Sequence, residues 1–323
     1  MPDRWPELAQ RFGLGQITAE PAFVARGAMG QVWRLETAGG RWAVKWLFEW
    51  APAHPLPADV AVQLAAAEAG IPLPPPVVAP DGTAVALVGG ELARVYHWAD
   101  LAEPLTPPVA PAVAAEAGRL LGLLHRMALA SAEPDDPWYS EIPAAGSWAE
   151  LSGRATSAGA AWAPALLAAR GLITELSARV EPPGTGPRII CHRDFNPDNV
   201  LPAAGSPLMV LDWENCGPLE PLRELGYAVF CWSCGAGSFS QAAARALVAG
   251  YAAATGGEPD LGAGFFSTAI AAHLNVLHVM AGQALADPAR RNIAEEFIAS
   301  LLGHDLADLL QLISQPRWER TLL

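Results

Sequence analysis

The sequence has very little lysine: Lys45 is the only lysine among the 20 basic residues of this 323-residue chain. A P-loop needs a Gly-Lys-Ser or Gly-Lys-Thr triplet, and Lys45 follows a valine, so no P-loop is present. The chain also lacks the G-x-G-x-x-G pattern of dinucleotide sites and the G-x-S-x-G turn of serine hydrolases. These absences remove the sequence support for three large enzyme classes.

Cysteine is also scarce, with four residues at positions 191, 216, 231 and 234. The stretch "CWSC" has no second pair of ligands, and a structural zinc site needs four, so we expect packed, reduced thiols. The N-terminus "MPDRWPELAQ" lacks the basic and apolar regions of a signal peptide. The most apolar stretch, 269–286, carries two histidines, an asparagine and a glutamine, which favours a buried helix over a membrane span. We therefore expect a cytoplasmic protein without a membrane partner.

Positive charge is the third shortage. The net charge is −13, and it is uneven: about −2 over residues 1–99 and −11 over residues 100–323. Nucleic-acid binding needs a basic stripe, and none is present, so we expect no nucleic-acid partner. The acidic second part could attract a cationic ligand, although solubility alone explains the same charge equally well.

The order of hydrophobic patterns predicts an α+β protein in two parts. Residues 15–50 alternate as three strands with glycine-rich turns, residues 58–69 read as a helix, and residues 83–98 read as two more strands. Composition then becomes helical from residue 112 onward, apart from a short strand pair around 188–211. We expect a domain boundary near residue 98: a small antiparallel sheet with one helix in 1–98, and a larger helical domain in 99–323.

The chemistry concentrates in "IICHRDFNPDNVLPAAGSPLMVLDWE", residues 189–214. Four positions stand out as H-x-D-x4-N with a later aspartate: His192, Asp194, Asn199 and Asp212. Such a pattern arises by chance in about two of a thousand chains of this length. Antiparallel pairing of the strands that enter each acid would bring Asn199 and Asp212 together, and hard oxygen ligands favour Mg²⁺ over Zn²⁺.

These residues, with Lys45 in "AVKWL", resemble the eukaryotic-type protein kinase fold. More narrowly they resemble the aminoglycoside phosphotransferase and small-molecule kinase family, as do "GIPLPPPV", "LLGLLHRM" and "LDWENCGPLEPLRELG". That family usually has His-Gly-Asp where this chain has His192-Arg193-Asp194. The resemblance covers about residues 22–230 and implies a bilobal kinase-like fold that binds ATP or GTP with Mg²⁺.

The resemblance also implies roles for individual residues. Asp194 would orient the acceptor hydroxyl and take its proton, His192 would brace the loop, and Asn199 and Asp212 would hold Mg²⁺. Lys45 would contact the α- and β-phosphates. The family pairs this lysine with a helix glutamate; the matching position here is Asp59, with Glu68 as the alternative.

Other nucleotide contacts are implied by position. Gly27 and Gly30 in "RGAMGQV" would let a turn lie over the phosphates, although a plain hairpin turn explains them as well. The segment 94–98 would bind adenine through the backbone of Val95, Tyr96 and His97.

The acceptor is the least determined part. The acidic second domain suits a cationic, hydroxylated molecule such as an aminoglycoside or a basic peptide antibiotic, which would make the enzyme an antibiotic-resistance kinase. The candidate acceptor residues are Trp213, Glu214, Glu220, Asp135 and Asp136, with Glu133 and Glu141 as further acids. A metabolic kinase for a sugar, an amino alcohol or homoserine is the alternative, and an inactive ligand-binding relative is a third. The chain could be a monomer or a homodimer.

Overall fold

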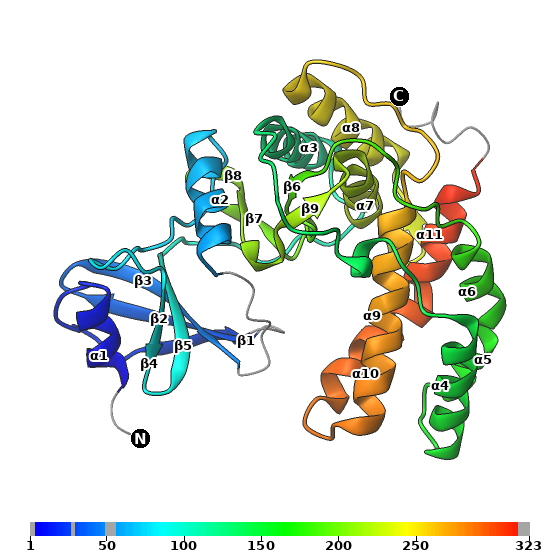
Figure 1. Cartoon of the computed structure of the whole chain (residues 1–323), viewed down its shortest axis with the longest axis horizontal. Helices are drawn as coiled ribbons and strands as arrows, with labels where there is room; N and C mark the ends of the chain where they lie inside the picture. Colours follow the sequence, from blue (N-terminus) through cyan, green and yellow to red (C-terminus); the bar gives the residue numbers. More distant parts are fainter. Residues whose placement is uncertain (1–3, 27–29, 49–55, 316–323) are drawn as a thin grey trace. The chain divides into compact units, whose positions relative to one another are not determined.

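The computed structural model describes residues 4–26, 30–48 and 56–315, which form two compact units (Figure 1). The first unit comprises Met1–Pro104 and Asn199–Cys216, and the second comprises Leu105–Asp198 and Gly217–Leu323. The sequence placed a boundary at residue 98. The first unit runs a little further and also takes a hairpin from the second half of the chain, because that hairpin bonds to it. The split of nucleotide and acceptor binding between residues 1–98 and 99–323 stays a prediction.

The first unit is built on a five-stranded antiparallel sheet of order β1-β2-β3-β5-β4. The strands are β1 Ala22–Arg26, β2 Gly30–Thr37, β3 Gly40–Leu47, β4 Val85–Val88 and β5 Glu91–His97. Alternation decides which face each side chain takes: Trp42, Val44 and Trp46 of β3 are buried in the core. Lys45 points to the opposite face, where it lies across from Arg94 of β5.

In the described part of the first unit, two α-helices accompany this sheet, where the sequence predicted one. Helix α2 (Leu56–Glu68) is the expected one, and α1 (Arg4–Arg11) was not predicted. An isolated helix of eight residues is marginal in water. Tertiary packing supplies what local sequence lacks: Leu8 is fully buried, and the Trp5 ring meets the Trp46 ring edge-on at 5.4 Å.

A short hairpin completes the first unit. Strands β7 (Val200–Ala203) and β8 (Ser206–Val210) pair antiparallel, with Val200 opposite Val210. The sequence predicted that the strand entering Asp194 would be the partner here, which is wrong: that strand, β6 (Ile189–Cys191), pairs with β9 (Gly217–Leu219) in the second unit. The predicted consequence still holds, because the two ends of the β7–β8 hairpin carry Asn199 and Asp212. The Leu211 amide donates to the Asn199 carbonyl at 2.8 Å.

The second unit is mostly helical. Its elements are α3 Pro111–Arg126, η1 Pro137–Tyr139, α4 Ala145–Ser157, α5 Ala163–Ala168, α6 Arg170–Ser177, α7 Pro221–Ser233, β10 Cys234–Gly235, β11 Ser238–Phe239, α8 Gln241–Thr255, α9 Ser267–Ala286, α10 Arg291–Ser300, η3 Leu301–Asp305 and α11 Leu306–Ile313. Helices α3 and α8 pack unusually close, side by side in Figure 1. A Cβ on Gly118 would stand 1.9 Å from the Leu247 carbonyl oxygen, and one on Gly250 would stand 2.0 Å from that of Ala115. Glycine on both helices therefore permits this contact.

Helix α9 is, among the described residues, the one helix long and apolar enough to cross a membrane by length and composition. The polar residues of the same stretch favoured a buried helix over a span. Its alanines and leucines outweigh His273, Asn275, His278 and Gln283 in the average. Within the second unit α9 packs against α4, α6, α7 and α10, and Leu274 and Leu277 are fully buried. These contacts are those of a core helix.

Candidate active site

Lys45 lies at the centre of a buried ionic cluster in the first unit. Its Nζ is 2.5 Å from Asp212 Oδ1 and 2.8 Å from Glu214 Oε1, and its side chain is only 12% exposed. Burial opposes the charge, but the carboxylates of Glu214 and Asp212 outweigh it and raise the pKa of Lys45. Lys45 is therefore a fixed positive charge on the face of the sheet opposite the core.

The predicted pairing of Lys45 with Asp59 is wrong. Asp59 on α2 forms its ion pair with Arg94, which is 2% exposed and stands beside Lys45 on the neighbouring strand. Glu214 lies 3.8 Å from the same guanidinium. Two adjacent cations thus interact with three acids. Arg94, with the longer side chain, pairs with Asp59 on helix α2. Lys45 pairs with Asp212 and Glu214, which follow β8.

Glu214 has a different setting from the predicted one. It was a candidate for the acceptor site, but its side chain is 11% exposed and contacts Lys45. Burial raises the pKa of Glu214, Lys45 opposes this, and the neighbouring Asp212 carboxylate adds to it. Trp213 is likewise buried, and its indole N–H donates to the Val210 carbonyl at 3.1 Å. Both side chains belong to the interior of the first unit, because the turn η2 (Trp213–Asn215) directs them inward.

We expect Arg94 to be essential for stability. Replacing Arg94 by methionine leaves the buried Asp59 carboxylate without its cation, so the free energy of unfolding should fall by about 3–5 kcal/mol. Chemical denaturation measures this directly. The control is Arg34→Met on β2, whose pair with Glu36 is 43% and 32% exposed and should be worth less than about 1 kcal/mol. Equal losses in the two variants would show that the buried network does not stabilise the fold.

Gly27 and Gly30 were predicted to let a turn lie over the phosphates. Gly27 lies outside the described residues. Gly30 opens β2, where it pairs with Leu47, and a Cβ there would stand 2.3 Å from the Trp46 carbonyl oxygen. Close strand approach is sufficient to require glycine at position 30. A contact with phosphate stays a prediction.

The segment predicted to bind adenine is partly occupied by the protein itself. The Val95 carbonyl accepts from the Val77 amide at 2.8 Å, and the His97 amide donates to the Pro75 carbonyl at 3.0 Å. Val95 is also buried in the core. Tyr96 faces the Lys45 cluster, and burial raises the pKa of its hydroxyl. The His97 amide cannot donate to a base while it donates to Pro75, whereas the Val95 carbonyl keeps a second lone pair. Adenine binding by this segment stays a prediction.

The hairpin ends fit a divalent cation. Asn199 and Asp212 offer amide and carboxylate oxygens, the hard ligands that Mg²⁺ prefers. The Asp212 side chain is 37% exposed, and Asp212 has a φ of 56°, which is uncommon for a residue other than glycine. A bound ion would neutralise charge on nucleotide phosphates there.

The loop that carries Asp194 is anchored in the second unit by Glu224 of α7. Glu224 is fully buried and accepts hydrogen bonds from the backbone amides of His192 and Arg193. His125 of α3 lies 2.7 Å from its Oε2. Burial alone would raise the pKa of Glu224, but the His125 contact and the loop amides lower it. His192 itself is fully buried, and its role in bracing the loop stays a prediction.

Arg193 occupies a backbone conformation that favours glycine. Its φ is 64°, which explains why the family that it resembles usually has glycine at this position. Several contacts hold the arginine there. Its guanidinium lies 4.7 Å from the Tyr139 ring centre and 3.6 Å from Asp136, and a Cβ on Gly217 would collide with it at 2.5 Å.

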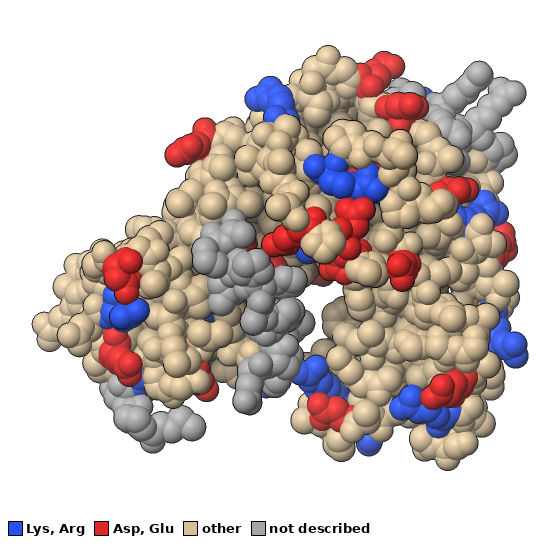
Figure 2. All heavy atoms as spheres, viewed as in Figure 1, with Lys and Arg blue, Asp and Glu red and all other residues tan. Residues whose placement is uncertain are grey.

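Three of the other acids predicted to bind a cationic acceptor, Asp135, Asp136 and Glu220, already have partners. Asp136 contacts Arg193 and caps η1 through the Trp138 amide, while Asp135 pairs with Arg188 at 3.0 Å. Glu220 lies 3.2 Å from Arg188 and accepts from the Gly184 amide. Figure 2 likewise shows several acidic side chains beside basic ones. These three carboxylates thus already interact with Arg188 and Arg193, while the net charge of the second part, which counts those arginines, stays negative.

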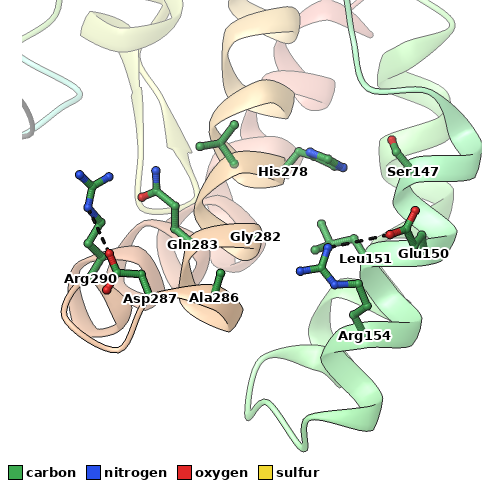
Figure 3. A pocket seen from close by; sticks show the side chains of 11 residues that line it. Ser147, Glu150, Leu151, Arg154, His278, Gly282, Gln283, Ala286, Asp287 and Arg290 are labelled. Atoms are coloured by element: carbon green, nitrogen blue, oxygen red, sulfur yellow. Dashed lines mark ion pairs between the residues drawn. The ribbon is translucent and has the colours of Figure 1, made fainter. Parts of the chain in front are cut away.

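A cavity of about 360 Å³ opens between α4 and α9 in the second unit (Figure 3). Its rim carries two ion pairs, Glu150–Arg154 at 4.0 Å and Asp287–Arg290 at 3.5 Å. Gly282 of α9 lines it, with no atom within 4 Å of where a Cβ would stand. The cavity therefore offers an apolar floor with charges of both signs above it.

Four residues that organise these sites were not predicted from the sequence: Arg94, Glu224, Asn196 and Tyr227. Glu224 lies in "PLRELG", a stretch whose resemblance to antibiotic kinases could have marked it. Asn196 and Tyr227 contact Asp194, at 2.6 Å and 3.1 Å, and no spacing in the sequence signals either contact.

Comparison with known proteins identifies the family. Residues 22–265 match the model of the phosphotransferase enzyme family. No curated protein matches the chain significantly. Among solved structures, a spectinomycin phosphotransferase in complex with ADP and spectinomycin aligns over 97% of this chain and 100% of its own, with TM-score 0.69 and 13% identity. An amicoumacin kinase in complex with AMP-PNP and Ca²⁺ aligns over 93% of both chains, with TM-score 0.60 and 13% identity.

A third solved structure, a microcompartment-associated aminopropanol kinase, aligns over 96% of this chain and 97% of its own, with TM-score 0.59 and 17% identity. At such identities the likeness concerns the fold, and it confirms the kinase-like α+β prediction. The family match extends from β1 to the segment before α9 and includes Lys45, Asp194 and Asp212. The chain therefore belongs to the phosphotransferase enzyme family, and the prediction that it is a phosphotransferase is confirmed.

Proposed function

We propose that this chain transfers the γ-phosphate of ATP or GTP, bound with Mg²⁺, to a hydroxyl group of a small hydroxylated amine. An antibiotic is the proposed acceptor class, which makes the protein a resistance enzyme of the cytoplasm. The carrying observation is the contact of Lys45 with Asp212 at 2.5 Å across 167 residues of sequence. It assembles, in one unit, the cation and the acid that phosphate and metal binding require.

Each group has a defined task in the proposed reaction. Lys45 neutralises charge on the α- and β-phosphates, and Asn199 and Asp212 hold the metal. Asp194 accepts the proton of the acceptor hydroxyl while the oxygen of that hydroxyl bonds to the γ-phosphorus. The bond from that phosphorus to the bridging oxygen breaks, and the nucleoside diphosphate leaves. Positioning and charge neutralisation, rather than covalent catalysis, carry the rate.

The cavity between α4 and α9 is the proposed place for the bulk of the acceptor. His273 of α9 packs 6.0 Å from the ring of Tyr227, which contacts Asp194. His278 follows five residues later, about 7.5 Å along the helix axis, and lines the cavity. A bulky, hydroxylated molecule with charged groups would match its apolar floor and charged rim.

A panel of acceptors tests the proposed function. The panel should contain aminoglycosides, spectinomycin, basic peptide antibiotics, choline-like amino alcohols, homoserine and neutral sugars, each with ATP and with GTP. We expect nucleoside diphosphate release that needs Mg²⁺, is lost with chelator, and is matched by a phosphoryl mass gain on the acceptor. Transfer to sugars, choline-like amino alcohols or homoserine alone would favour the metabolic kinase instead. Nucleotide hydrolysis without any phosphorylated acceptor would contradict both hypotheses.

Filling the cavity separates the two acceptor classes further. Gly282→Trp starts its side chain from a Cβ position that meets no other part of the chain within 4 Å and faces the cavity, so the fold should tolerate it. We expect the KM for a bulky antibiotic to rise about 10-fold or more, because lost contacts of this size are worth about 1–3 kcal/mol. The KM for nucleotide should not change. The control is Gly146→Trp on α4, which also has open space but does not line the cavity. An unchanged antibiotic KM in Gly282→Trp would place the acceptor elsewhere.

A further inference from the structure

We infer that Tyr227 of α7 is a positioning residue for Asp194, holding the carboxylate of the proposed base through its phenol hydroxyl. The hydroxyl donates to Asp194 Oδ1 at 3.1 Å. The inference rests on the proposed function, since it assumes that Asp194 takes the acceptor proton. It adds a residue that no sequence motif marked.

The same oxygen receives a second donor. The Asn196 side-chain amide donates to Asp194 Oδ1 at 2.6 Å and lies 3.5 Å from the Tyr227 hydroxyl. Two donors that converge on one oxygen set the plane of the carboxylate. One comes from the loop itself and the other from a helix that packs beneath it, so the orientation does not depend on loop conformation alone.

Helix α7 supplies both the backbone anchor and the side-chain anchor of this loop. Glu224 and Tyr227 are three residues apart and so share one face of the helix. Glu224 accepts from the His192 and Arg193 amides, and Tyr227 donates to Asp194 one position later. Three consecutive residues of the loop are thus fixed to two side chains of one rigid element, the arrangement that a precisely oriented base needs.

Tyr227 is suited to the role of a permanent donor. Burial raises the pKa of its phenol, so the hydroxyl stays protonated across the working pH range. Among the described residues, ionisable groups on packed elements that sense the Asp194 charge include Tyr227 and Cys231 of α7, His273 of α9 and Tyr139 of η1. Burial likewise raises the pKa of Cys231 and Tyr139 and lowers that of His273, so all of these groups are held in their neutral forms.

A hydrogen bond to the ionised carboxylate favours that form. Removing the Tyr227 hydroxyl should therefore make Asp194 harder to ionise and leave its plane less restrained. The pH dependence of kcat/KM reports the free enzyme's base, so its acid limb should move to higher pH. A residue that only supported the fold would not move this limb.

The test is Tyr227→Phe in the full-length chain, assayed with the best acceptor from the panel and saturating Mg²⁺. We expect kcat to fall about 10-fold and the acid limb of kcat/KM to rise by about 0.5–1 pH unit, as expected for loss of one hydrogen bond to a carboxylate. Nucleotide affinity, measured by calorimetry, should stay at the parent value. Asn196→Ala removes the other donor and should move the limb in the same direction.

The matched control is Tyr251→Phe. Its hydroxyl lies 3.1 Å from His125 Nδ1, and it is not one of the two donors described for Asp194 Oδ1. Its acid limb should therefore stay in place whatever happens to its melting temperature. A Tyr227→Phe enzyme with a parental limb and kcat would overturn the inference, and so would an equal limb shift in Tyr251→Phe. Failure of the proposed function is detected by a different variant, Asp194→Asn. If Asp194→Asn kept full activity, Asp194 would not be the base.

Discussion

Replacing Asp194 by asparagine should leave the chain folded and reduce phosphoryl transfer by about 10²-fold or more. The amide cannot accept the acceptor proton, and a positioned general base contributes a factor of this size. Nucleotide affinity should change little, because Lys45 and Asp212, which are proposed to bind phosphate and metal, belong to the other unit. Steady-state kinetics gives the first quantity and calorimetry with a non-hydrolysable nucleotide gives the second.

Asp198→Asn is the natural control for this variant, because Asp198 is an exposed acid four residues further along the same loop. It should turn over like the parent enzyme. If Asp194→Asn abolished nucleotide binding while turnover per bound nucleotide persisted, Asp194 would be a nucleotide ligand and not the base.

The single lysine provides the second large effect. Lys45→Arg should keep a melting temperature close to that of the parent but lower kcat/KM by about 10- to 10³-fold, as expected when one preorganised electrostatic contact is misplaced. The ammonium fits between Asp212 Oδ1 and Glu214 Oε1, and Arg94 already occupies the adjacent cross-strand position. A planar guanidinium is wider than an ammonium, so it should push the Asp212 carboxylate, which is 37% exposed, toward solvent while Arg94 keeps its pair with Asp59.

The control for Lys45→Arg is the reverse exchange at an exposed site, Arg34→Lys on the neighbouring strand β2, where the side chain is 43% exposed. It should leave both stability and kcat/KM unchanged. A Lys45→Arg enzyme with parental turnover would mean that the lone lysine is an accident of composition in an arginine-rich sequence.

The sequence alone predicted the parts of this protein that depend on short range. Period-two alternation put Lys45 on the face opposite Trp42, Val44 and Trp46. The hairpin that joins Asn199 to Asp212 is likewise a local event, since its two strands follow each other within a few residues. The sequence assigned the wrong partner strand to β8, but Asn199 and Asp212 still meet because they flank the two paired strands of this hairpin. The motif and its spacing were enough for the family.

Tertiary structure decided which charges pair. Asp59, Asp212 and Glu214 are all acids that could serve Lys45, and their spacing along the chain does not rank them. Arg94 decides among them, because it lies beside Lys45 on the neighbouring strand and pairs with Asp59. Lys45 is then left with Asp212 and Glu214. In the second unit the arginines at 188 and 193 similarly claim Asp135, Asp136 and Glu220. Ion pairing depends on distances of a few ångströms and on burial. Neither quantity can be predicted from the spacing of residues along the chain. Tyr227 could not be predicted for the same reason: its contact with Asp194 forms only because α7 packs against the loop in the folded protein.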